Sequence, residues 1–135
     1  MIEAENRLEE SEIHYRKARL KGGSRAAQGK SGEAIGEYKM ALQAEQNFFE
    51  AHYNLGNILK SQGKLDEAIS HYRKALTINP DDADTHNNLA NALRQKGRTD
   101  DAISHYFLPI RIKPDYAAAH SNLGYMLMDK GRLDE

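Results

Sequence analysis

The sequence predicts an all-α repeat solenoid, a right-handed superhelix built from helix–turn–helix units. Residues 49–82 are followed without a gap by a near copy, residues 83–116, and the two segments are identical at 15 of 34 aligned positions. Within each copy, apolar residues recur at helical spacing in two runs that a glycine separates. A fixed period of this size is typical of a small unit that is copied and stacked. We therefore expect function to lie on a repeated surface and not in a single pocket.

The clear unit, residues 49–82, justifies each part of the helical pair. The first helix carries Leu55 and Leu59 on its apolar face and should end at Gly63, because glycine enters the left-handed region at little cost. Asp66 is placed to cap the second helix, and Pro80 stops it. Small residues at Gly56, Ala68 and Ala75 would let the two helices approach closely.

The period divides the 135-residue chain into one solenoid domain with several parts. These are an N-terminal helical extension (1–14), a degenerate first repeat (15–48), two full repeats (49–82 and 83–116) and a partial fourth repeat with a first helix only (117–135). The segment at 8–18 echoes the second-helix pattern but lies off the 34-residue register. It is either the worn second helix of a lost repeat or a chance match.

Two places depart from the pattern. Pro109 lies inside the second helix of the third repeat, where it should kink the helix because it has no N–H to donate. In the last repeat, Gly131 should close the first helix, and no second helix follows to cover Leu123 and Leu127. Either the chain is a fragment of a longer array, or this open face finds another chain.

Composition excludes several classes of function. Nineteen basic and 20 acidic residues give a net charge of -1 without blocks of like charge, so neither nucleic acid nor an anionic membrane is an expected partner. The chain has no cysteine, which removes disulfides and thiolate chemistry. It shows no signal peptide at its start and no apolar run of the roughly 20 residues that a membrane span needs. A soluble, cytoplasmic module is expected.

The spacing of small and large apolar residues resembles the tetratricopeptide repeat (TPR) family. The residues that carry the resemblance are Leu55, Gly56, Leu59, Ala68, Tyr72, Ala75 and Pro80. The sequence departs from the family at its favoured tryptophan, where it has His52, His86 and His120. Within the family it is most similar to the superhelical repeat arm of O-GlcNAc transferase, through the runs AHYNLG and AHSNLG.

That resemblance implies a ladder of asparagines on the inner, concave surface, at Asn54, Asn88 and Asn122; in the first repeat the 34-residue register puts Leu20 at this position. Because no transferase domain is present, it does not imply the enzymatic activity. Family members that clamp a terminal carboxylate use a lysine just before the ladder position. Here Tyr53, Asn87 and Ser121 occupy that place, which argues against this mode.

The residues support the same face without the resemblance. Asn54 and Asn57 are three apart, so they share a helix face, which is not the face that bears Leu55. A carboxamide offers both a donor and an acceptor, which suits the backbone of an extended peptide. The alternative is that these asparagines are solvated surface or hydrogen-bond between neighbouring helices. The candidate peptide-binding residues are Asn54, Asn57, Asn88, Asn91, Asn122, Tyr53, Lys60, Arg94 and Tyr125.

The six histidines do not predict a metal site. Equivalent histidines of adjacent units would lie about 9–10 Å apart, whereas zinc ligands lie about 2 Å from one ion. We expect packed or half-buried histidines, no metal and no cofactor. No pair of residues forms a recognisable catalytic arrangement, and acidic residues at second-helix starts are explained by the helix dipole, so no catalytic residue and no enzyme activity are expected.

The sequence therefore predicts a non-enzymatic protein–protein interaction scaffold that binds an extended peptide or partner segment. One alternative is a self-assembly module, a homo-oligomer formed through the Leu123/Leu127 face or the degenerate first repeat. Another is the regulatory arm of a larger enzyme.

Overall fold

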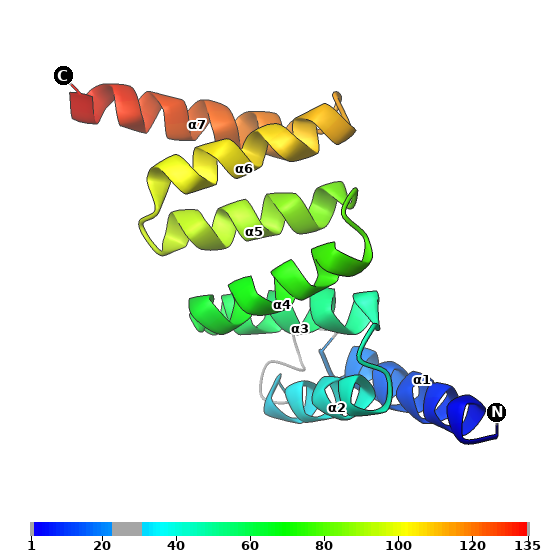
Figure 1. The fold of residues 1–135 in the computed structure, drawn as a ribbon. Coiled ribbons are helices and arrows are strands. Elements are labelled where there is room, and N and C mark those ends of the chain that lie inside the picture. The colour runs from blue at the N-terminus through cyan, green and yellow to red at the C-terminus, as the bar shows by residue number, and fades with distance from the viewer. Residues whose placement is uncertain (1, 23–30, 135) are drawn as a thin grey trace.

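The fold is a stack of α-helices, described for residues 2–22 and 31–134 of a computed structural model (Figure 1). Within these residues there are seven helices and no strand. The helices are α1 (Ile2–Gly22), α2 (Ser31–Ala44), α3 (Phe49–Ser61), α4 (Leu65–Ile78), α5 (Ala83–Gln95), α6 (Thr99–Ile112) and α7 (Ala117–Asp134). They pack as three successive pairs with α7 laid on the last pair, so the two ends of the chain lie at opposite ends of the stack. The predicted all-α repeat architecture is confirmed.

In each helix pair, a buried tyrosine of the second helix packs against the first helix. In the clear unit, Leu55 and Leu59 of α3 are buried, and Tyr72 of α4 is fully buried beside Gly56. A Cβ atom added at Gly56 would lie 2.7 Å from Cε1 of Tyr72, so this close approach requires glycine. The fully buried Ala68 belongs to the same core. The small residues therefore do what their spacing predicted: they let the tyrosine ring lie against the facing helix.

The turns between paired helices are closed by backbone hydrogen bonds. Gly63 has φ of 78° and Gly97 has φ of 87°, in the left-handed region that glycine alone enters readily. The N–H of Lys64 then donates to the carbonyl of Leu59 at 2.9 Å. As a result α4 begins earlier than expected: Lys64 is its N-cap, without a side-chain bond, and Asp66 lies in its first turn. The prediction that Asp66 caps α4 is wrong.

The first pair keeps a different register from the others. Asn88 donates to the hydroxyl of Tyr53, 35 residues earlier, whereas Asn54 donates to the hydroxyl of Tyr15, 39 residues earlier. Relative to α3, α1 is thus displaced by four residues, and His14–Tyr15 stands where His52–Tyr53 stands in the next unit. Contact with Asn54 therefore comes from Tyr15, and Leu20, 83% exposed, does not take the ladder position.

α1 serves as the first helix of the first pair, and it runs unbroken across the boundary expected at residues 14 and 15. Segment 8–18 lies within this first helix, so it is not the worn second helix of a lost repeat. α1 ends at Gly22, and residues 23–30 of the expected first repeat lie outside the described residues. The later repeat boundaries fall at the starts of α3, α5 and α7.

The end of the stack differs from expectation at two residues. α7 continues through Gly131 to Asp134, so the prediction that Gly131 closes this helix is wrong. Leu123 is only 8% exposed and belongs to the core, so it does not form an open face, while Leu127 is 48% exposed. α6 passes through the buried Pro109 without interruption and has 14 residues, as α4 does. None of the described helices is long and apolar enough to cross a membrane.

Candidate functional site: the asparagine face

Five asparagines of the first helices form one surface, which we call the asparagine face. Its members are Asn54 and Asn57 on α3, Asn88 and Asn91 on α5, and Asn122 on α7. All five are half-buried. Asn54, Asn88 and Asn122 contact the preceding unit, whereas Asn57 and Asn91 contact the second helix of their own unit and the first helix of the next. The spacing of three and the repeat period thus bring together the residues that the sequence singled out.

The ladder asparagines, at positions 54, 88 and 122, direct their amide N–H groups into the stack. Asn88 Nδ2 donates to the hydroxyl of Tyr53 at 3.1 Å and to Oδ1 of Asn57 at 3.1 Å. Asn122 Nδ2 repeats this with Oδ1 of Asn87 at 3.4 Å and Oδ1 of Asn91 at 3.3 Å. Together with the bond from Asn54 to Tyr15, these contacts join every ladder amide to the unit before it.

Asn57 and Asn91 hold each pair together internally. Oδ1 of Asn57 accepts a hydrogen bond from the hydroxyl of Tyr72 at 2.5 Å, and Oδ1 of Asn91 accepts one from the hydroxyl of Tyr106. Both tyrosines are fully buried, and burial raises the pKa of both phenols. Each of these oxygens also accepts from the next ladder amide, so it joins three helices. Hydrogen bonding between helices, the alternative that the sequence left open, is present.

What the face offers outward is a row of acceptors. In the described part of the chain, Oδ1 of Asn54, Asn88 and Asn122 accepts no hydrogen bond, although the Nδ2 groups of the same side chains are engaged. Their chemistry toward a ligand is therefore one-sided. Each ladder asparagine can accept a hydrogen bond from a ligand N–H, at one position per unit.

The residues around the ladder differ in availability. The ring of Tyr53 stacks on Phe49, with centroids 6.1 Å apart, and its hydroxyl already bonds to Asn88. Tyr125 is 61% exposed and free to contact a ligand. Lys60 and Arg94 are half-buried in the last turns of α3 and α5, and neither has an ion-pair partner among the described residues. Burial lowers the pKa of Lys60, and the charge of Arg94 lowers it further.

Stacked helix pairs are typical of a helical repeat protein, and here the groups that could contact a ligand lie along one extended surface. The chain belongs to the TPR repeat family, whose model matches residues 22–63, 56–94 and 90–131. No curated protein matches.

Several solved structures share the fold. The first TPR of Spaghetti (RPAP3) bound to the HSP90 peptide SRMEEVD superposes with a TM-score of 0.83 at 17% identity, over 92% of this chain and 95% of that one. The Arabidopsis OM64 TPR domain gives a TM-score of 0.79 at 16% identity, over 89% and 96% of the two chains. A mutant of O-GlcNAc transferase from Thermobaculum terrenum gives 0.74 at 24% identity, over 87% of this chain but 22% of the other.

Proposed function

We propose that this chain is a non-enzymatic scaffold that binds an extended segment of a partner protein along the asparagine face. The observation that carries the proposal is the row of unengaged Oδ1 atoms at Asn54, Asn88 and Asn122. The N–H groups of a peptide backbone are the donors that such a row would meet. A fold relative that holds a peptide, the first TPR of Spaghetti, supports the same kind of partner.

The spacing of the acceptors favours an extended peptide with no internal hydrogen bonds. Adjacent units lie about 9–10 Å apart, the distance between packed helices. A polyproline-type chain advances about 3.1 Å per residue with three residues per turn, so its N–H groups return to the same side every 9 Å or so. One turn of such a chain would thus match one unit. A helical peptide would not, because its own carbonyls already occupy its N–H groups.

The test replaces the three ladder asparagines with alanine and compares the peptide affinity of this variant with that of a control variant changed at asparagines outside the face. A peptide would be selected from a displayed library on the wild-type chain, and its affinity measured by fluorescence anisotropy. The triple variant Asn54→Ala, Asn88→Ala, Asn122→Ala should bind at least tenfold more weakly, because each lost hydrogen bond contributes about 0.5–1.5 kcal/mol. The control Asn47→Ala, Asn79→Ala changes exposed asparagines off the face and should leave affinity unchanged. Unaltered binding by a triple variant of normal helicity would reject the ladder.

A second candidate is self-assembly through α7. Tyr125, Leu127 and Met128 expose 61%, 48% and 60% of their surface, so the outer side of this helix is apolar. Light scattering discriminates: a dimer that Leu127→Asp abolishes would support this reading, whereas a monomer at high concentration contradicts it.

A further inference from the structure

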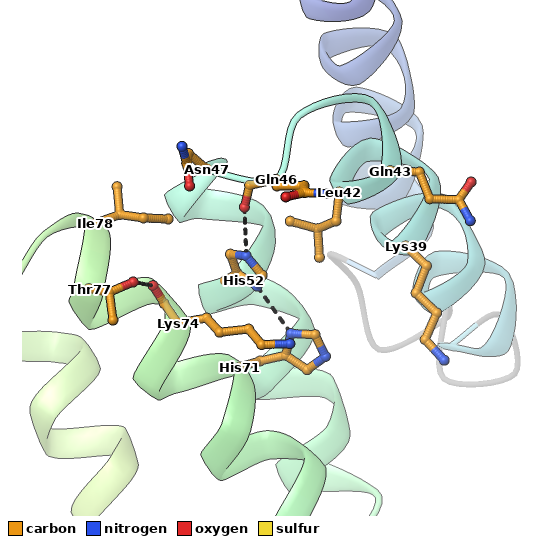
Figure 2. Close-up of a pocket in the computed structure, with 10 residues that line it drawn as sticks. All are labelled: Lys39, Leu42, Gln43, Gln46, Asn47, His52, His71, Lys74, Thr77 and Ile78. Carbon is orange, nitrogen blue, oxygen red and sulfur yellow. Dashed lines mark hydrogen bonds between the residues drawn. The ribbon is translucent and has the colours of Figure 1, made fainter.

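Two histidines that the sequence did not connect meet inside the second unit. His52 on α3 and His71 on α4 are 19 residues apart, and their Nδ1 atoms lie 3.1 Å from each other (Figure 2). They line an open pocket of about 560 Å³ that α2 also borders. The spacing of equivalent histidines in adjacent units gives no sign of this contact, because the two rings come from the two helices of one unit.

The backbone fixes which nitrogen of His52 faces its partner. Nε2 of His52 lies 3.0 Å from the carbonyl oxygen of Gln46, which can only accept, so Nε2 carries the hydrogen. The lone pair of His52 is therefore on Nδ1, directed at His71. His86 has the same arrangement, with Nε2 2.7 Å from the carbonyl oxygen of Pro80. A histidine oriented through one nitrogen by a carbonyl is the arrangement found in most metal-ligating histidines.

The next unit repeats the pair and leaves it unsatisfied. His86 on α5 is 9% exposed, and His86 and His105 stand 34 residues after His52 and His71 on the equivalent helices α5 and α6. Nδ1 of His86 and Nδ1 of His105 are both buried without a hydrogen-bond partner among the described residues. Leaving a buried polar atom unpaired is unfavourable, so a bound group that contacts both nitrogens would stabilise this unit.

We propose that the pairs His52/His71 and His86/His105 are two-histidine sites for a divalent metal ion of the zinc class. Two nitrogens each about 2.0–2.1 Å from a tetrahedral ion lie about 3.3–3.4 Å apart. The Nδ1 atoms of His52 and His71 are 3.1 Å apart, so small ring rotations bring both onto one ion. On binding, the hydrogen of His71 moves from Nδ1 to Nε2 through solvent in the pocket. Both rings stay neutral and no net proton is released.

The surroundings select the ion. No group of three or more potential protein ligands occurs in the described part of the chain, so water would fill the remaining positions of each ion, and the pocket beside His52 and His71 has room for it. Lys39 and Lys74 border the same pocket and disfavour a positive ion. Affinity must then come from imidazole nitrogen, which suits Zn²⁺, Cu²⁺ and Ni²⁺ and excludes the oxygen-seeking Mg²⁺ and Ca²⁺.

The same positions elsewhere in the stack supply controls. In the first unit, His14 faces Glu37, which stands at the place of His71, and the two side chains contact at 2.5 Å. His120 is oriented by the carbonyl of Pro114 at 2.7 Å, as His86 is by that of Pro80. Among the described residues no second histidine contacts His120, so it is an oriented histidine outside any pair.

The test titrates Zn²⁺ into the intact, tag-free chain by calorimetry after chelator treatment. The wild type should take up two ions per chain, His71→Gln one, and the double variant His71→Gln, His105→Gln none. Glutamine keeps a donor for the facing histidine, and circular dichroism checks that helicity is retained. His120→Gln should still bind two ions.

Nitrogen spectra of the histidines locate the ion, because coordination shifts Nδ1 of His52 and leaves its carbonyl-bonded Nε2 in place. Wild-type binding below one ion per chain would overturn the proposal, as would equal uptake by the double variant. A single ion that His105→Gln removes and His71→Gln does not would overturn the His52/His71 site.

Discussion

Gly56→Ala should destabilise the fold even though alanine is the better helix former. The added Cβ would lie 2.7 Å from Cε1 and 2.9 Å from Cδ1 of Tyr72. That ring is fully buried and is held at its far end by the 2.5 Å bond to Asn57, so it cannot move aside without losing packing or the hydrogen bond. Overpacking by one methyl costs about 1–3 kcal/mol, whereas replacing glycine by alanine inside a helix gains about 1 kcal/mol. The net loss should be about 1 kcal/mol.

The assay is urea unfolding followed by circular dichroism, with Gly124→Ala as the matched control. Gly124 stands at the aligned position of α7, where an added Cβ meets nothing within 4 Å. That variant should gain about 1 kcal/mol from helix propensity alone. In the double variant Gly56→Ala, Tyr72→Phe, the ring is released from Asn57 and the alanine should cost less. If Gly56→Ala gains as much stability as Gly124→Ala, the close contact does not limit packing and the reasoning fails.

Two further predictions follow from single residues. Pro109→Ala should raise stability by about 1–3 kcal/mol in the same urea assay, because alanine restores the N–H that can donate to the carbonyl of His105; lower stability would mean that burial of the proline ring outweighs that bond. Burial raises the pKa of Tyr38 from 10.0 to about 12, so the unfolded chain loses this proton first and stability should fall as pH rises from 10 to 12. Tyr38→Phe should flatten that dependence in urea unfolding between pH 9 and 11.5, and an unchanged slope would contradict it.

The fold could be predicted because one short unit determines most of it. A period of 34 residues, a glycine at each turn and small residues opposite Tyr72 and Tyr106 are all legible in the letters. The first unit was harder, because α1 keeps a four-residue offset from the later register. The repeated dipeptide His14–Tyr15 and His52–Tyr53, 38 residues apart, was the signal that could have shown it.

The asparagine face could be predicted only in outline. Periodicity places Asn54, Asn88 and Asn122 on one side, but it does not tell which amide atoms are engaged. That depends on Tyr53 and Asn57 of the neighbouring unit reaching Asn88, a contact between side chains far apart in sequence. The meeting of His52 and His71 was missed for the same reason, since it arises from the crossing of two helices within a unit.

The hydrogen bonds that the asparagine side chains make between units also affect how easily the stack of helices bends. At the contacts between successive first helices, the Nδ2–H groups of Asn88 and Asn122 donate to the preceding unit, while the Oδ1 atom of each side chain accepts no hydrogen bond within the described residues. A donor that approaches that oxygen polarises the amide and strengthens the bonds that its N–H groups already make. A ligand lying along the face would therefore raise the bending stiffness of the rod from one unit to the next. The stack would bend most easily without a ligand, and its curvature would become fixed as the ligand contacts successive units.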